Sequence, residues 1–222
     1  MAPVLVLSLL APLSIYFGLI VLQNVPLTFI LYHGIICLGI PLIDFTMIQK
    51  QTVGQYLNAL GFRNFRKTLF PSLITGLLFG SIIYLFITGL QKHLIDIEQT
   101  RSLLARWNFS NNHLFLFLFI MIFANSVLEE IYWRGCIYSK LEGSVSPKVQ
   151  ILFTAFFYAS YHLITTTNLF SVGYGLLLTS AIFGAGCFWG YFRQKQNSIY
   201  LPIISHLLAD LGIMLVYIKF FI

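Results

Sequence analysis

The chain has 222 residues, of which 58% are hydrophobic and only 9% are charged, and its mean hydropathy is +0.85. Soluble domains carry about 25% charged residues, so this composition excludes a soluble globular protein and predicts a polytopic membrane protein. The net charge of +6 comes from basic residues scattered over the loops, without the patch or stripe of a nucleic-acid binder, so no nucleic acid is expected among its partners.

Seven apolar runs are long enough to cross a bilayer, which takes about 20 helical residues. The predicted fold class is therefore all-α, a polytopic transmembrane helical bundle of about seven spans. The runs lie near residues 3–22, 27–48, 68–90, 113–138, 149–166, 170–192 and 199–221. The first run has no positive segment before it, so we interpret it as a retained span rather than a signal peptide. A short break at 23–26 predicts a hairpin between the first two spans.

Loop charges predict the orientation of the chain. Loops 49–67, 139–148 and 193–198 carry a basic excess, whereas loop 91–112 is mixed and loop 167–169 is uncharged. These two groups of loops alternate along the chain, so the positive-inside rule places the N-terminus in the cytoplasm and the C-terminus outside. We expect an integral protein of the cell's inner (cytoplasmic) membrane, with lipid as a partner. The oligomeric state is left open.

Two further patterns bear on packing. Loop residues 51–67 and 97–107 have room for an interfacial helix, which would not change the number of spans. The sixth span contains Ser180-x-x-x-Gly184 and Gly186-x-x-x-Gly190, and small residues four apart let helices approach closely. In a polytopic chain this pattern favours internal packing over dimerisation.

The fourth span carries the most informative stretch of the sequence. Glu129, Glu130 and Arg134 end an apolar run, and a charge at membrane depth is expensive and indicates function. Glu130 and Arg134 are four residues apart and share one helix face, so they predict an ion pair. Glu129 lies about 100° around the helix and is left to face a polar cavity. A purely structural ion-pair cluster is the alternative for these three residues.

Two later spans carry the other ionisable groups at membrane depth. The fifth holds His162, and the seventh holds His206 and Asp210, which are four residues apart on one face. Measured from the predicted cytoplasmic ends at about 1.5 Å per residue, Glu129, His162 and His206 lie at roughly 15, 21 and 12 Å. The sequence therefore predicts that they share one water-filled cavity. His33, a lone histidine in the second span, is given no role.

This set of side chains points to hydrolysis. A buried glutamate beside a histidine can act as a general base toward water, and an arginine or a second histidine can stabilise an oxyanion. The sequence has neither a GxSxG nucleophile elbow nor an HExxH zinc motif. A metal-free mechanism needs no cofactor, whereas zinc bound by Glu129, His162 and His206 is the alternative. The residues alone do not decide between the metal-free and the zinc-dependent mechanism.

At these positions the chain resembles the CPBP family of CAAX proteases and bacteriocin-processing proteins, also called the Abi family. Its three motifs are EExxxR, FxxxH and HxxxN or HxxxD, on separate membrane helices. Glu129, Glu130 and Arg134 match the first in full, and His206 and Asp210 match the third. The second is altered, because Tyr158 stands where the motif before His162 has phenylalanine.

The resemblance implies an intramembrane endopeptidase that cuts near the C-terminus of a membrane-associated protein or peptide. Glu129 and His162 would activate water, His206 and Asp210 would bind the oxyanion or position the water, and Glu130 with Arg134 would support them. The resemblance also divides the single membrane domain into three N-terminal spans with their loops, 1–112, and a catalytic core, 113–222. The alternatives are a non-proteolytic immunity or scaffold protein of this family and a small proton-coupled transporter.

Overall fold

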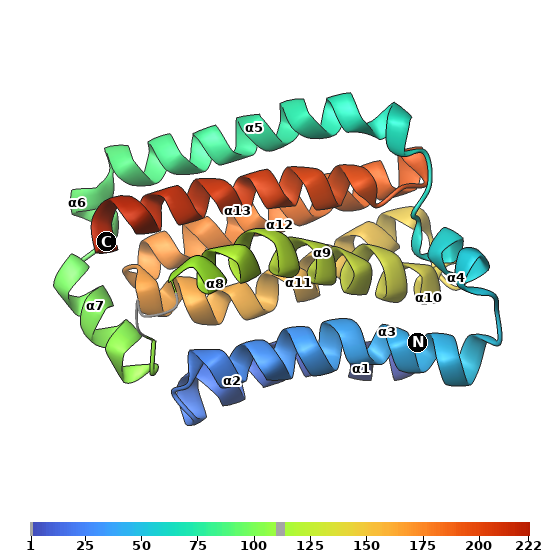
Figure 1. Ribbon diagram of the computed structural model, residues 1–222, viewed down its shortest axis with the longest axis horizontal. Helices are drawn as coiled ribbons and strands as arrows, with labels where there is room; N and C mark the ends of the chain where they lie inside the picture. Colours follow the sequence, from blue (N-terminus) through green and yellow to red (C-terminus); the bar gives the residue numbers. More distant parts are fainter. Residues whose placement is uncertain (1, 110–113) are drawn as a thin grey trace.

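The structure is a computed structural model that describes residues 2–109 and 114–222. The regular elements in these ranges are all helical, and no strand occurs within them. Figure 1 shows the long helices running side by side along one axis, with short helices gathered at the two ends. The predicted all-α bundle is confirmed. The predicted boundary between residues 112 and 113, and the first residue of the predicted span 113–138, lie outside the described residues.

The first two spans form the predicted hairpin. Residues 2–21 combine α1 (Ala2–Ile15) with the π-helical segment η1 (Tyr16–Val21). The chain turns at Asn24, whose side chain accepts a hydrogen bond from the backbone nitrogen of Leu27 at 2.9 Å and so caps the next helix. That second span is continuous from 25 to 49 and is built from α2 (Val25–Phe29), η2 (Ile30–Gly39), α3 (Ile40–Ile43) and η3 (Asp44–Gln49).

Each of the two loops that had room for an interfacial helix contains a short helix. One is α4 (Val53–Leu60), which begins with a capping box at Thr52 and ends at Gly61, whose φ of 99° favours glycine. The other is α7 (Ile97–Arg106), which follows the short α6 (Gln91–Leu94). Between these two loops the third span, α5 (Phe65–Gly89), crosses the bundle.

The remaining spans make up the second half of the chain. The fourth is one continuous helix, made of α8 (Leu114–Phe119), η5 (Ile120–Ala124), α9 (Asn125–Glu130), η6 (Ile131–Ile137) and α10 (Tyr138–Leu141). It is followed by α11 (Pro147–Leu169), α12 (Val172–Gln196) and α13 (Tyr200–Phe221).

Six of these seven helical segments are long and apolar enough to cross a membrane. The seventh predicted span, α11, has 23 residues and the required length, but it carries polar side chains such as Gln150, Thr154 and His162. It packs against α1 and α12, so those side chains are turned largely toward protein. The bundle therefore fits about seven spans.

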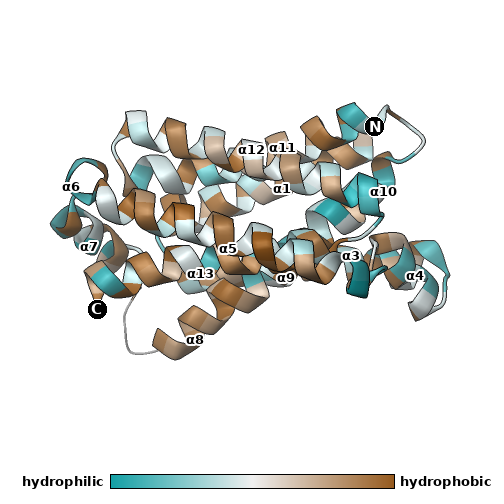
Figure 2. Ribbon diagram, turned by 90° about the horizontal axis from the view of Figure 1, so that it is seen from above, coloured by the Kyte–Doolittle hydropathy of each residue, from teal (hydrophilic) through white to brown (hydrophobic). Residues whose placement is uncertain are grey.

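The outer surface of the bundle is apolar. On α5, Phe70, Leu77 and Leu85 are 72%, 59% and 66% exposed. Figure 2 shows hydrophobic residues along the middle of the bundle and hydrophilic residues toward α4 and α6 at its ends. Large exposed apolar side chains on every side suit a lipid environment, and the protein is an integral membrane protein.

The loops with a basic excess meet at one end of the bundle. Asn64 donates a hydrogen bond from its side chain to the carbonyl oxygen of Gln196 at 3.1 Å, and Ser198 donates to the carbonyl oxygen of Arg63 at 2.6 Å. Ser139 in turn donates to the carbonyl oxygen of Ala59 at 3.0 Å. Figure 1 places α6, α7 and the C-terminus at the opposite end. The predicted grouping of the loops is confirmed.

Small residues set the closest helix contacts. Within the motif of α12, a Cβ atom at Gly186 would lie 3.1 Å from the Cβ atom of Ala155, and one at Gly190 would lie 3.2 Å from Ile151. Both contacts are to α11, which confirms the prediction of internal packing for this pair. Gly184, by contrast, faces open space.

α5 and α13 approach each other more closely than α11 and α12 do. A Cβ atom at Gly80 would overlap the carbonyl oxygen of Leu208, and one at Gly212 would lie 2.5 Å from the carbonyl oxygen of Gly80. We expect Gly80→Ala and Gly212→Ala each to lower the free energy of unfolding by about 1–3 kcal/mol, because the two backbones must separate. Unfolding of the purified protein in detergent measures this.

Gly184→Ala is the matched control, because its Cβ atom would meet nothing within 4 Å. Alanine is favoured over glycine in a helix by about 1 kcal/mol, so this variant should be as stable as the parent or more stable. Equal stability in all three variants would show that α5 and α13 do not require the close approach.

Candidate functional site

The fourth span places two glutamates side by side in the protein interior. Glu129 at the end of α9 is 2% exposed, while Glu130 and Arg134 are 0% exposed. Arg134 donates from Nη1 to Oε1 of Glu130 at 2.9 Å, which confirms the predicted pair. The pair is fully buried, so each charge depends on the other.

The guanidinium of Arg134 is held from several sides. Its Nη2 atom donates to the carbonyl oxygen of Gly186 on α12 at 3.1 Å. Its central carbon lies 4.5 Å from the ring centre of Tyr158 and 5.3 Å from that of Trp189, so both aromatic faces stabilise the cation. Arg134 is thus committed to Glu130 and to the helix packing around it.

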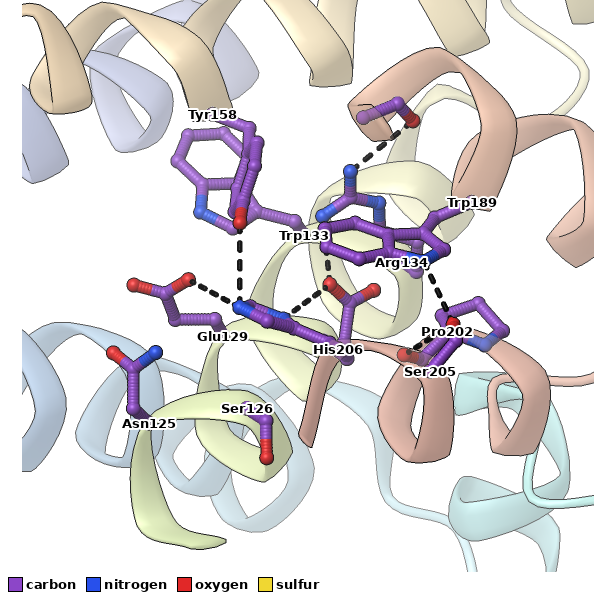
Figure 3. Close-up of polar contacts among 12 residues, drawn as sticks. Asn125, Ser126, Glu129, Trp133, Arg134, Tyr158, Trp189, Pro202, Ser205 and His206 are labelled. Carbon is purple, nitrogen blue, oxygen red and sulfur yellow. Dashed lines mark hydrogen bonds and ion pairs between the residues drawn. The ribbon is translucent and has the colours of Figure 1, made fainter. Parts of the chain in front are cut away.

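His206 on α13 lies between the two glutamates. Its Nδ1 atom is 3.1 Å from Oε1 of Glu130, and because a carboxylate accepts, Nδ1 is the donor. Its Nε2 atom is 3.8 Å from Oε2 of Glu129. The ring stacks on Trp189 at 4.6 Å, and Trp189 is fixed by a 2.8 Å hydrogen bond from its Nε1 to Ser205. Figure 3 shows His206 with Glu129 on one side and Trp189 on the other.

Two more groups face Nε2 of His206. Oδ2 of Asp210 is 3.5 Å away, one turn along α13. The hydroxyl of Tyr158 is 3.3 Å away, as Figure 3 shows. Tyr158 stands at the position where the CPBP motif has phenylalanine, so the altered residue adds a hydroxyl group to this site.

His162 is connected to the site through Tyr158. Its Nδ1 atom donates to the carbonyl oxygen of Tyr158 at 2.8 Å, and its ring packs on Tyr158 and Tyr161. Among the described residues, no hydrogen bond or ion pair joins His162 to Glu129 or His206. Of the three residues predicted to share one cavity, Glu129 and His206 face each other at 3.8 Å, whereas His162 is linked to His206 only through Tyr158.

Two residues of the cluster were missed in the sequence. His33 on η2 is buried, and its Nε2 atom lies 2.7 Å from Oδ1 of Asn125 and 3.9 Å from Oε1 of Glu129. Asn125 donates from Nδ2 to Oδ2 of Asp210 at 2.9 Å. The structure thus places His33, which the sequence analysis gave no role, beside the candidate site. An ionisable residue at membrane depth is itself a signal of function, and that signal was available for His33.

A cavity of about 370 Å³ opens at the end of the bundle that carries the basic loops. It is lined by residues that include Asp44, Cys136 and Arg193, but not by Glu129 or His206. Arg193, which lines this cavity, donates from Nε to the carbonyl oxygen of Arg134 at 2.9 Å. In the part of the chain that the structure describes, no three His, Cys, Asp or Glu side chains are arranged as ligands of one metal ion.

Fold and site together define a class: a polytopic helical membrane protein with a buried glutamate–histidine centre. Residues 111–212, a little under half of the chain, match the family model described as type II CAAX prenyl endopeptidase Rce1-like. This match confirms the resemblance, and this region belongs to the CAAX protease (CPBP) family. No curated protein and no solved structure matches the chain. At the level of the family, the match supports an intramembrane CAAX-type endopeptidase.

Proposed function

We propose that this protein is an intramembrane endopeptidase that hydrolyses a peptide bond near the C-terminus of a membrane-associated protein or peptide, with Glu129 as the general base. The observation that carries the proposal is the state of the Glu129 carboxylate. Its Oε2 atom is buried without a hydrogen-bond partner among the described residues, and it faces Nε2 of His206 at 3.8 Å. A buried acceptor without a partner is costly and indicates a functional group.

In this proposal Glu129 takes one proton from a water molecule, whose oxygen forms a bond to the carbonyl carbon of the scissile peptide. The carbonyl oxygen becomes an oxyanion in the tetrahedral intermediate. Glu129 then returns the proton to the leaving nitrogen as the carbon–nitrogen bond breaks, which releases an amine and a carboxylic acid. A positioned general base of this kind contributes about 10²–10⁴-fold to the rate.

His206 is the group best placed to meet the oxyanion. Glu130 accepts from its Nδ1–H, and in the doubly protonated ring, which the surrounding carboxyl groups of Glu129, Glu130 and Asp210 favour, Nε2 also carries a hydrogen and can donate it to the oxyanion. Arg134 is already bound to Glu130 and Gly186, and this favours His206 over the arginine for that task. Asp210 supports His206 from the next turn of α13.

His162 has a ring nitrogen suited to water. Because Nδ1 donates to the carbonyl oxygen of Tyr158, its Nε2 atom carries the lone pair. In our proposal this lone pair accepts the second hydrogen of the attacking water, alongside Glu129. A zinc-dependent version would instead use Glu129, His162 and His206 as ligands, and elemental analysis of the purified protein, with cleavage assayed before and after chelation, decides between the two.

We further propose that the end of the bundle that carries the basic loops lies on the cytoplasmic side of the cell's inner membrane. The basic excess of these loops supports this, because lysine and arginine favour the cytoplasmic side. The N-terminus is then cytoplasmic and the C-terminus lies outside. A membrane-impermeant reagent added outside the cell should label a single cysteine placed at Gln99 but not one placed at Ser144. Labelling at Ser144 and not at Gln99 would show the opposite orientation.

The experiment that tests the function compares the C-terminal peptides of three cell populations: wild type, a deletion, and the deletion complemented with Glu129→Gln. The proposal expects at least one membrane-associated protein to carry a shortened C-terminus in the wild type only. The substrate so found also shows whether it carries a prenyl group, to which the name of the matched family refers. Identical C-termini in all three populations would favour a non-proteolytic immunity or scaffold protein.

A further inference from the structure

A histidine outside the region that matches the family reaches the candidate catalytic glutamate. His33 is carried by the second span, far in the sequence from residues 111–212. Its ring stacks on Phe29 at 5.0 Å and meets the edge of Tyr32 at 4.8 Å, so its orientation is fixed by aromatic packing. With 8% of its surface exposed, it is a polar group in an apolar interior.

The hydrogen bonds of Asn125 define the direction of a chain of donors. Asn125 donates from Nδ2 to the carboxylate of Asp210 at 2.9 Å, so its Oδ1 atom points the other way, toward His33. An amide oxygen can only accept, so Nε2 of His33 must carry the hydrogen. The chain therefore runs from His33 through Asn125 to Asp210, and Asp210 lies 3.5 Å from Nε2 of His206.

The same Nε2–H group faces Glu129. The distance from His33 Nε2 to Oε1 of Glu129 is 3.9 Å, and the distance from His206 Nε2 to Oε2 of Glu129 is 3.8 Å. Each oxygen of this carboxylate thus has a different imidazole beside it. Both distances exceed a direct hydrogen bond, and the hydrogen on His33 Nε2 is donated to Asn125, so His33 acts on the carboxylate by packing beside it.

We propose that His33 is a positioning residue of the active site, which orients Glu129 directly and Asp210 through Asn125. The inference rests on the function proposed above. It means that the N-terminal spans complete the catalytic centre, and that the region matching the family is not sufficient by itself. Misplacing a reacting group by about 1 Å can cost about 10²-fold in rate, which sets the scale of the expected effect.

The test compares three variants: His33→Ala, His33→Asn and His33→Gln. The amide nitrogen of glutamine reaches the position of Nε2 and can donate to Asn125, whereas that of asparagine stops near the position of Nδ1. We expect kcat to fall about 10- to 100-fold for Ala and Asn, with KM changed less than about twofold, and to recover to within about fivefold of the parent for Gln. The probe is a fluorescent peptide spanning the Glu129-dependent cleavage site found by the C-terminal comparison.

A further variant tests the chain of hydrogen bonds. Asn125→Ala should lower kcat by a similar factor, and combining it with His33→Ala should cost no more than the larger single loss, because both break the same connection. Thermal unfolding in detergent accompanies every assay. His33→Asn and His33→Gln should unfold at similar temperatures, so that their difference in kcat does not reflect folding.

Several outcomes would overturn the inference. One is an unchanged kcat in a folded His33→Ala variant. Another is an equal loss of kcat in His33→Asn and His33→Gln that follows their unfolding temperatures, which would show that His33 has only a structural role. A protein whose cleavage depends on Glu129 but not on His33 would overturn this inference alone. Cleavage that does not depend on Glu129 would overturn the proposed function, and this inference with it.

Discussion

Glu129→Gln is expected to abolish detectable peptide-bond cleavage by the reconstituted protein, with a loss of about 10²–10⁴-fold or more, while the protein remains folded. Glutamine has the shape of glutamate but cannot take a proton from water, so the general base is lost. Glu129 makes no ion pair with Arg134 in this structure, since Glu130 occupies that position. The substitution therefore leaves the buried pair intact, and cleavage in proteoliposomes together with unfolding in detergent measures both effects.

Glu98→Gln is the matched control for this prediction. Glu98 lies on α7 at the end of the bundle opposite the basic loops, and its side chain is 83% exposed. It should leave cleavage and stability unchanged. Cleavage at the parental rate by Glu129→Gln would refute the assignment of the base. A variant that fails to fold would instead show that Glu129 is part of the structural core.

Arg134→Ala is expected to lower the free energy of unfolding by about 3–5 kcal/mol, because it leaves the Glu130 carboxylate buried without its cation. The effect is large because both partners are fully buried and joined at 2.9 Å. Removal of the guanidinium also takes away its contacts with Tyr158 and Gly186. Unfolding of the purified variant in detergent, referenced to the parent, gives the value.

The chain offers a surface ion pair for comparison. Arg101 and Glu98 lie 3.3 Å apart, but their side chains are 53% and 83% exposed. Arg101→Ala should change the stability by no more than about 1 kcal/mol, since exposed pairs contribute little. If Arg134→Ala were as stable as Arg101→Ala, the buried pair would have no structural role. Arg134→Met also leaves the Glu130 carboxylate without its cation. Adding Glu130→Gln to this variant removes that unpaired charge and should restore part of the stability that Arg134→Met loses.

The spans of this protein could be predicted because their signal is local. Crossing a bilayer demands about 20 apolar residues in a row, and the runs ending at Gln49 and Gly89 satisfy this within one segment of chain. The pair of Glu130 and Arg134 was equally accessible, because residues four apart on a helix share a face. The span with His162 was recovered by length and position, although its polar side chains make it less apolar than the others.

The connections between helices were not accessible in this way. His33 and Asn125 are 92 residues apart, and the sequence around neither residue predicts its contact with the other. The hydroxyl of Tyr158 is another case. In the sequence Tyr158 weakened a family motif, whereas in the structure it reaches His206. Such contacts depend on how whole helices pack, and a pattern read along one helix contains no information about its neighbours.

The sequence by itself determined that this is a helical membrane protein, that Glu129, His206 and Asp210 are candidates for one site, and that Glu130 pairs with Arg134. Only the tertiary structure decided how these groups divide their contacts. It placed His206 between the two glutamates, connected His162 by way of Tyr158, and brought His33 from the second span to Glu129. The physical reason is that hydropathy and helical spacing act within a segment, whereas hydrogen bonds between spans exist only after the helices have packed.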